Sequence, residues 1–183
     1  SIGFYLSGNP LEKYESDLDE FANVSLANIP DKKPEEIRIG GIIRKVNTRY
    51  DKNNRPWAIV ELNGSAGKAD IFVFNDVFEK TKSLLTDDNL VFIKGSPSNR
   101  DDDPEKLKMI AGDVFPLAET RSRLSRYVNI RLDNSYTDAD IISQIKLLSS
   151  AHKGRCGFML HLQAESGAVQ KIRASKTGVS PSP

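Results

Sequence analysis

The chain has 183 residues, of which 38% are hydrophobic and 28% charged, and its formal net charge is +1. This is the balance of a globular protein with one good core or two small ones. No apolar run approaches the ~20 residues of a membrane span, so we expect a cytoplasmic protein without membrane contact. A single cysteine, Cys156, excludes an internal disulfide, and the scarcity of Cys and His argues against a zinc site. Because the chain starts with Ser1 and not with methionine, and residues 3–6 begin in the middle of a pattern, we expect a piece of a longer protein.

Residues 1–37 predict a helical lead-in followed by a linker. Asn9, Pro10 and Glu12 together form a helix start, with an asparagine cap, proline in the first turn and glutamate three residues after the cap. Apolar residues then recur at helical spacing. The acidic residues expected on the solvent side are Glu15, Asp17, Asp19 and Glu20. Such a face could dock a basic partner, but a solvated surface is the simpler interpretation.

Residues 38–117 predict a small barrel of five short strands interrupted by one helix. The strands are expected at residues 38–49, 56–62, 68–74, 89–95 and 107–111. A helix capped by Asp76 is expected to present apolar residues as far as Leu85 on one face. Gly40 and Gly41 suit the sharp bend of a long barrel strand. This order is that of an OB-fold, a closed barrel that mostly holds single-stranded nucleic acid.

The remaining third of the chain predicts a second, smaller unit. Residues 118–126 are expected to form a basic connector, and residues 127–176 a small β-α-β-β domain. The expected strands lie at residues 127–132, 157–163 and 168–174, and the helix at 137–151. Residues 177–183 are expected to be a loose tail. The fold class is therefore mainly β with α, an OB-fold barrel between a short helix and a small α+β domain.

Residues 3–11, GFYLSGNPL, resemble the segment that joins the polymerase core to the OB domain in alpha subunits of bacterial DNA polymerase III. That family usually has histidine at the position of Asn9. The barrel is similar as well, in residues 39–46, the turn at 50–55, Trp57 with its successor, and 71–74. Asn75 departs from the family, which commonly has proline there. The resemblance spans essentially the whole chain.

This resemblance implies the C-terminal part of a DNA-directed DNA polymerase, a nucleotidyltransferase of the bacterial replisome. Its OB domain is expected to bind single-stranded DNA. Its C-terminal domain lies where the clamp-loader tau subunit attaches in that family, so tau and other replisome proteins are the expected partners.

Nine residues are expected to contact nucleic acid, since an OB barrel binds on its second and third strands beside the loop after the first. They are Arg44, Arg49, Tyr50, Lys52, Arg55, Trp57, Lys68, Phe72 and Phe74. Strand alternation puts Phe72 and Phe74 on one face with Lys68 and Asp70. Packing of the aromatic rings in the core or beneath the helix is the alternative interpretation.

Charge is unevenly distributed along the chain. The net charge is −5 over residues 1–37, +1 over 38–117 and +6 over 120–183, with Glu119 between the last two ranges. A near-neutral barrel with four carboxylates in the loop 98–105 predicts weak binding of single strands, because cationic side chains supply most non-specific affinity. An OB module that binds only protein, or one that binds RNA, are the alternatives. The positive charges after residue 120 are spread along the sequence, which favours a protein partner for that domain.

The sequence predicts no catalytic residue, metal ligand or cofactor for this segment. Asp138 and Asp140 have the Asp-x-Asp spacing of a two-metal site, but they directly precede an apolar helical series. They are better explained as a helix cap and first turn. The adjacent aspartates at 101–103 are better explained as a solvated loop than as a metal site. We therefore expect a segment without enzymatic activity of its own.

Overall fold

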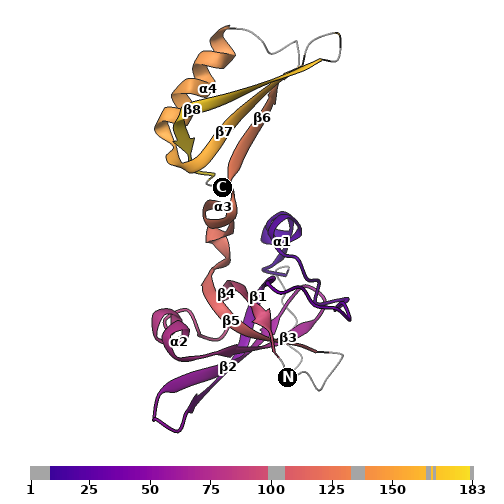
Figure 1. The fold of residues 1–183 in the computed structure, drawn as a ribbon, viewed down its shortest axis with the longest axis vertical. Coiled ribbons are helices and arrows are strands. Elements are labelled where there is room, and N and C mark those ends of the chain that lie inside the picture. The colour runs from indigo at the N-terminus through magenta and orange to yellow at the C-terminus, as the bar shows by residue number, and fades with distance from the viewer. Residues whose placement is uncertain (1–8, 99–105, 133–138, 164–165, 167, 182–183) are drawn as a thin grey trace. The chain divides into compact units, whose positions relative to one another are not determined.

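The structure is a computed structural model that describes residues 9–98, 106–132, 139–163, 166 and 168–181. The chain divides into two compact units, Ser1–Thr120 and Arg121–Pro183 (Figure 1). The first contains a closed barrel and the second an open three-stranded sheet. Within the described residues, no helix is long and apolar enough to cross a membrane.

Five strands close the barrel in the order β1-β2-β3-β5-β4. The strands β3 and β5 are parallel, and every other neighbouring pair is antiparallel. Helix α2 lies between β3 and β4 in sequence. This is the topology of the OB-fold, as predicted. The element bounds are β1 (Ile37–Tyr50), β2 (Pro56–Asn63), β3 (Lys68–Val73), α2 (Asn75–Thr81), β4 (Leu90–Pro97) and β5 (Leu107–Pro116).

The long strand β1 serves two neighbours. It pairs with β4 up to Ile42 and with β2 from Ile42 onward. Neither Gly40 nor Gly41 has a positive φ, so close packing explains these glycines better than an unusual backbone conformation. A side chain at Gly41 would meet the Asn63 carbonyl oxygen at 2.5 Å, and one at Gly40 would overlap the side chain of Leu18.

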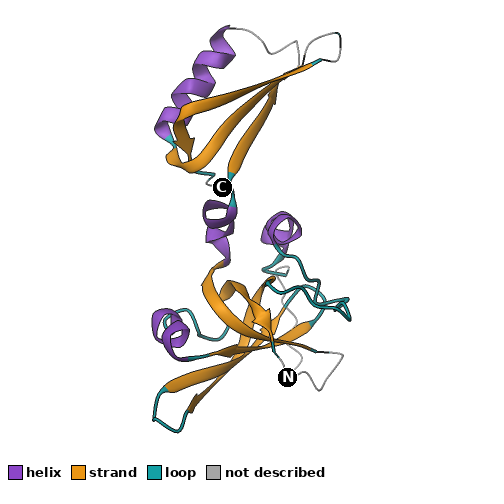
Figure 2. Cartoon of the chain, viewed as in Figure 1, coloured by secondary structure: helices purple, strands orange, loops and turns teal. Residues whose placement is uncertain are grey.

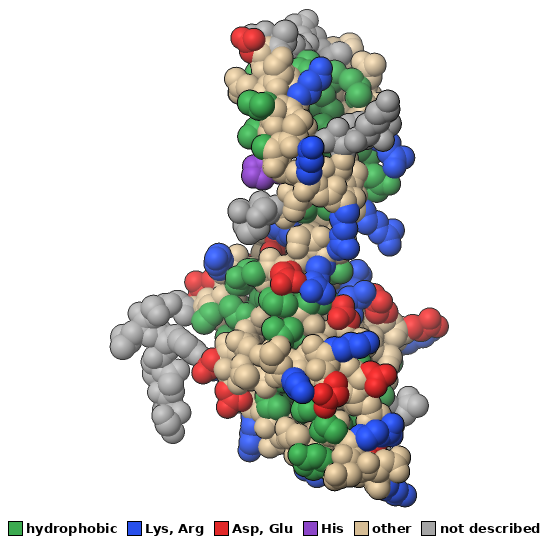
Figure 3. Space-filling model, turned by 90° about the vertical axis from the view of Figure 1, so that its left-hand side faces the viewer, with side chains coloured by type: hydrophobic (Ala, Val, Ile, Leu, Met, Phe, Trp, Pro, Cys, Tyr) green, Lys and Arg blue, Asp and Glu red, His purple; other side chains and the backbone are tan. Residues whose placement is uncertain are grey.

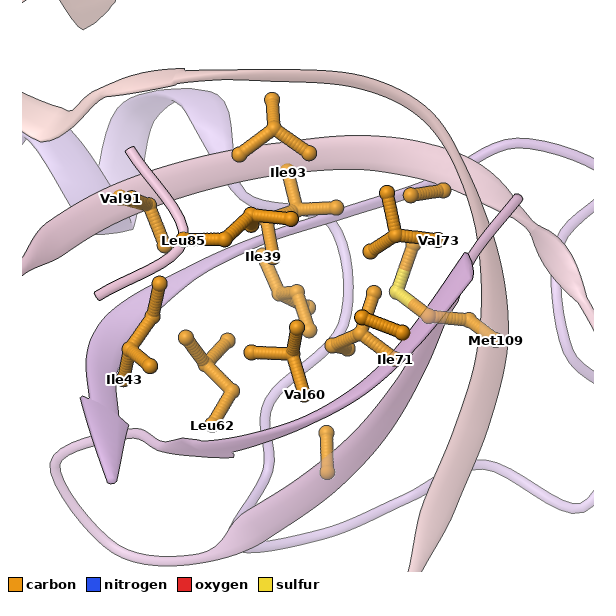
Figure 4. Close-up of a cluster of buried hydrophobic side chains, with 14 of the residues drawn as sticks. Ile39, Ile43, Val60, Leu62, Ile71, Val73, Leu85, Val91, Ile93 and Met109 are labelled. Atoms are coloured by element: carbon orange, nitrogen blue, oxygen red, sulfur yellow. The ribbon is translucent and has the colours of Figure 1, made fainter. Parts of the chain in front are cut away.

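Alternate apolar residues of all five strands fill the barrel (Figure 4). Val60, Ile71 and Ile93 are completely buried. Side chains from outside the strands join this core, including Val24 of the lead-in and Leu85 after α2. Complete burial of one such side chain contributes about 1.5–3 kcal/mol. Because alternate residues of each strand are held in this core, the residues between them face outward.

The lead-in contains a 3₁₀ turn, η1 (Glu12–Tyr14), and helix α1 (Glu15–Phe21). Asn9 and Glu12 make the expected reciprocal contacts: the Leu11 N–H donates to Asn9 Oδ1 at 3.1 Å, and the Asn9 N–H donates to Glu12 Oε1 at 3.3 Å. The α-helix itself begins three residues later than Glu12 because the first turn is tighter.

Asp17 is only 8% exposed, so its expected position on the solvent side of α1 is wrong. The helical period explains the error. Tyr14, Asp17 and Phe21 are spaced by three and four residues, which places the aspartate in the same stripe as the two rings. The other three acidic residues of this helix are not buried.

Helix α2 is shorter than predicted. It begins at Asn75, so Asp76 lies in its first turn and is not the cap, and it ends at Thr81. Leu84 and Leu85 follow in a turn, where the Asn89 side-chain amide donates to the Leu84 carbonyl at 3.0 Å. This side-chain contact occupies a carbonyl that a longer helix would have used.

The second unit has the predicted β-α-β-β order. Its sheet order is β6-β7-β8, with β6 and β7 parallel and β7 and β8 antiparallel. Helix α4 covers one face of this sheet (Figure 2). The strand β8 runs into the segment that was expected to be a loose tail, as far as the buried Val179. The bounds are β6 (Tyr127–Leu132), α4 (Ala139–Ala151), β7 (Lys153–Gln163) and β8 (Val169–Val179).

The expected connector is largely helical, with η2 (Leu117–Glu119) followed by α3 (Thr120–Leu124). Its last residues accept hydrogen bonds from side chains of β7. The Arg155 guanidinium donates to the carbonyls of Ser122 and Arg123, and the buried Cys156 thiol donates to the Ser125 carbonyl at 3.1 Å. These contacts make the end of the connector part of the second unit.

Candidate nucleic-acid interface

The outer face of strands β1 to β3 follows from the register of their pairs. Paired residues share a face, and the neighbours of the core residues point outward. Arg49 pairs with Trp57, and Ile59 pairs with Phe72. We call this surface the barrel face. Its residues are Lys45, Asn47, Arg49, Trp57, Ile59, Glu61, Asn63, Lys68, Asp70, Phe72 and the neighbouring Phe74.

Three aromatic rings gather on the barrel face. The ring centroids of Trp57 and Phe74 are 5.2 Å apart, with planes inclined by 35°. Those of Phe72 and Phe74 are 6.2 Å apart and nearly parallel, at 9°. Phe74 is 37% exposed, and the other two rings are partly exposed. The rings therefore pack on one another outside the core, and core packing is excluded for Phe74.

Arg49 is the cation best placed beside these rings. It is exposed, pairs in register with Trp57, and makes no ion pair with any residue that the structure describes. Three of the other predicted cations are engaged. Arg44 contacts Asp88 at 2.8 Å, Arg55 contacts Asp51 at 2.9 Å, and Lys68 contacts Glu61 at 3.8 Å.

The turn between β1 and β2 is held together by one carboxylate. Asp51 Oδ1 accepts hydrogen bonds from the Asn53 and Arg55 N–H groups at 2.8 and 2.9 Å, and Oδ2 accepts from Arg55 Nε. The Arg55 backbone hydrogen bond is the main reason that the pKa of Asp51 is below its ordinary value. The turn therefore presents the exposed Lys52 from an ordered scaffold.

Tyr50 lies outside the aromatic cluster. It pairs with Pro56, one residue beyond Arg49, so its side chain projects from the opposite face of the β1–β2 hairpin. It is 66% exposed.

The prediction omitted Lys45, Asn47 and Ile59, which share the barrel face. The alternation of inward and outward residues that predicted the outer side of β3 is the feature of the sequence that points to them. A register shift between Ile43 and Lys45 changes the parity of β1, and a bulge of this kind cannot be located from the sequence pattern.

The barrel face is not strongly cationic. Glu61 and Asp70 share it, and Asp70 is paired with Lys106 at 2.7 Å. Figure 3 shows acidic and basic side chains interspersed over the visible side of the barrel. Of the predicted acidic loop 98–105, residues 99–105 lie outside the described part of the chain. Affinity for a polyanion must then come from stacking more than from charge.

The carboxylates of the described residues do not converge. Asp140 lies in the first turn of α4, as predicted, and Asp138 lies outside the described residues. Where the structure is described, no group of three or more His, Cys, Asp or Glu side chains could hold a metal ion.

The fold and this face together define an OB-fold domain with an exposed aromatic surface. Curated proteins similar to the chain carry the name DNA polymerase III subunit alpha. The relative from Saccharopolyspora erythraea is 26% identical over 98% of the chain, that from Escherichia coli K12 is 24% identical over all of it, and that from Bacillus subtilis 168 is 22% identical over 93%. The chain spans only about 15% of the length of these relatives. The predicted resemblance to polymerase III alpha subunits is thus confirmed across essentially the whole chain, although no family model matches it.

Among solved structures, the chain is similar over less than half of its length to single-stranded DNA binding proteins. A mitochondrial protein of this kind from S. cerevisiae has a TM-score of 0.36 and 17% identity, covering 47% of this chain and 96% of that one. A corresponding domain from Synechococcus has a TM-score of 0.36 and 13% identity, covering 46% of this chain and 98% of that one.

Proposed function

We propose that this chain is a non-catalytic segment of a bacterial DNA polymerase III alpha subunit, and that its barrel face binds single-stranded DNA. The parent polypeptide would carry the DNA-directed DNA polymerase activity elsewhere in its length, in the bacterial cytoplasm. The observation that carries the proposal is the exposed cluster of Trp57, Phe72 and Phe74 beside Arg49. Aromatic rings next to a cation on this part of an OB barrel suit stacked bases and a passing phosphate.

The composition of the face determines how such binding should behave. Base stacking tolerates any sequence because every base has a π-face, and each stacked base contributes about 1–3 kcal/mol. Arg49 and Lys52 are exposed and make no ion pair within the described residues, so few phosphates would be neutralised. We therefore expect weak binding with little base preference and a shallow salt dependence. Such binding suits a surface that guides a moving template.

The barrel proposal is tested by titrating a fluorescein-labelled oligothymidine with the chain at two salt concentrations. Trp57→Ala is expected to weaken binding by about 1–3 kcal/mol. Tyr50→Ala is the matched control, since it removes a more exposed ring from the opposite face of the same hairpin. Equal losses for both variants, or equal binding of duplex and single strand, would contradict the proposal. A collapsed thermal transition in Trp57→Ala would show that the ring supports the fold instead.

The absence of catalysis is tested separately. The purified chain should extend no primer in the presence of Mg²⁺, because a polymerase needs carboxylates that converge on two ions. Extension that disappears in an Asp140→Asn variant would overturn this part of the proposal.

The C-terminal unit is proposed to bind another replisome protein, of which the clamp-loader tau subunit is our candidate. Support comes from α4, where Leu147 and Leu148 are 72% and 59% exposed. Leu148 also lines a pocket of about 290 Å³ with Ile145 and Phe158. Hydrophobic side chains on the visible surface of this unit appear in Figure 3. Exposed apolar side chains beside a pocket are typical of protein-binding surfaces.

A pull-down with tau tests this assignment. Leu147→Ser with Leu148→Ser should reduce capture at least about tenfold, as expected when buried apolar anchors are lost. Ser143→Ala on the same helix is the control. Unchanged capture by the double variant would remove α4 from the interface.

A second candidate function is an OB module that binds protein only. The acidic Glu61 and Asp70 on the barrel face favour it, because they repel phosphate. The two functions differ in one measurement: if the barrel binds protein only, Trp57→Ala leaves the oligothymidine titration at low salt unchanged.

A further inference from the structure

The sheet of the C-terminal unit has one face that α4 does not cover. Phe158 and Leu160 of β7 point toward the helix side and are 8% exposed. The residues between them therefore point the other way, together with their partners on β6 and β8. We call this surface the open face. Its described residues are Tyr127, Asn129, Arg131, Gly157, Met159, His161, Gln163, Val169, Lys171 and Arg173.

A row of three nitrogen-bearing side chains crosses the open face. Arg131 pairs in register with His161, and His161 pairs with Lys171. Neighbouring strands are about 4.8 Å apart, so the row spans about 10 Å. His161 Nε2 lies 3.1 Å from Asn129 Oδ1, which fixes the position of the imidazole between the two cations. Residues that are forty positions apart in the sequence thus form one cationic row.

An aromatic ring lies on the same face, four residues before Arg131 on β6 and therefore about 13 Å along the strand from this row. The Tyr127 ring lies over Gly157, since a side chain there would approach Tyr127 Cδ1 within 2.6 Å. The Arg173 guanidinium carbon is 5.7 Å from the ring centroid, within cation–π range. The ring is nevertheless 46% exposed. Because Gly157 has no side chain, the Tyr127 ring can pack there while part of its surface stays exposed.

The open face carries no acidic residue among those that the structure describes. This distinguishes it from the barrel face, where Glu61 and Asp70 accompany the cations. The prediction that the positive charges of this domain are scattered is therefore wrong for Arg131, Lys171 and Arg173, which strand pairing brings onto one surface.

We propose that the open face is a second binding surface for single-stranded nucleic acid, independent of the barrel face. The row from Arg131 to Lys171 would hold phosphates, and Tyr127 would stack on a base. Charge complementarity selects a polyanion, and the ring beside the cations favours a nucleic acid over an acidic protein segment, which has no bases to stack. Cations and a ring on an open sheet match the way single strands are bound elsewhere.

The test uses the full chain and a photoreactive bromodeoxyuridine oligonucleotide. Irradiation followed by peptide mapping should place a cross-link in the peptide containing Tyr127. In anisotropy titrations, Arg131→Gln with Lys171→Gln should weaken binding about threefold to tenfold and lower the salt slope by about 1.4, the effect of two lost phosphate contacts. Lys146→Gln with Lys153→Gln removes the same charge from α4 and the start of β7, and should change binding by less than about twofold.

Each outcome separates the two proposals. An unchanged slope in the open-face pair, or an equal loss in the α4 control pair, would overturn the second surface and leave the barrel proposal intact. If Trp57→Ala has no effect but the open-face pair abolishes binding, the barrel proposal fails and this one stands. Displacement of the oligonucleotide by polyglutamate at equal charge would show that the face binds acidic chains without reading bases, which contradicts the role of Tyr127. Tyr127→Phe should retain binding and Tyr127→Ala should lose it.

Discussion

The barrel face and the open face are both surfaces of β-sheets, but the first sheet is closed into a barrel and the second is open. The barrel closes on itself, so its core is surrounded by strands and only the outer face can meet a partner. The C-terminal sheet is open, and α4 covers one face of it. The closed sheet bears clustered rings with balanced charge, whereas the open one bears clustered cations with one ring. The closed barrel buries side chains from all five of its strands, whereas the open sheet packs on a single helix.

The largest expected effect tests this difference in cores. Ile71→Ala in the completely buried barrel core should lower the free energy of unfolding by about 2–5 kcal/mol. Ile59→Ala, on the outer face of the neighbouring strand, should cost much less because its side chain is only partly buried. Urea denaturation followed by tryptophan fluorescence reports the barrel, since Trp57 is the single tryptophan. Similar costs for the two variants would mean that the barrel is not packed as described.

The next effect concerns two glycines of the barrel. A side chain at Gly95 would overlap the backbone carbonyl of Ile110, so Gly95→Ala should destabilise the closing β4–β5 pair by about 1–3 kcal/mol. Gly112→Ala is the matched control, because its Cβ would lie 3.6 Å from the nearest atom, the Lys94 carbonyl oxygen. Thermal unfolding distinguishes them.

In the open sheet, Gly157→Ala should behave in the opposite way. Its new Cβ would come within 2.6 Å of the exposed Tyr127 ring, which can move, and would lie 3.5 Å from the Arg126 carbonyl oxygen, an ordinary contact. We expect a small change in melting temperature and a clear loss of cross-linking at Tyr127. A melting temperature that falls as far as in Gly95→Ala would remove the contrast between the two sheets.

A smaller effect separates stacking from charge on the barrel face. Arg49→Gln should weaken binding about twofold to fourfold and lower the salt slope by about 0.7, because one phosphate contact is lost. Trp57→Ala should weaken binding more but leave the slope unchanged. The comparison is made in the same titration series, and a slope that falls with Trp57→Ala but not with Arg49→Gln would reverse the roles of these residues.

The smallest effect is the pH dependence of the β1–β2 turn. The pKa of Asp51 is lowered in the folded state, so its contribution is present above its ordinary value of 3.8 and is lost as the pH falls through the lower folded pKa. The Asn53 and Arg55 amide resonances, whose N–H groups donate to Asp51, should shift in that acidic range. In Asp51→Asn they should not shift. Shifts centred above 3.8 would contradict the lowered pKa.

The sequence alone determined the architecture, because the period-2 pattern of the strands and their turns are local properties. The inward positions of Ile71 and Val73 and the outward positions of Phe72 and Phe74 follow directly from it. The prediction failed for Asp17: its charge indicated an exposed position, but its helical spacing from Tyr14 and Phe21 places it in the stripe of these two partly buried rings.

Only the tertiary structure decided which residues meet across strands. The bulge after Ile43 sets which β1 side chains accompany Trp57, and pairing across the second sheet brings Arg131, His161 and Lys171 into one row. Neither could be read from the chain, since strand register depends on long-range pairing whose partners are separated by tens of residues. These residues are far apart in the sequence, and the pairing of β6, β7 and β8 places them side by side.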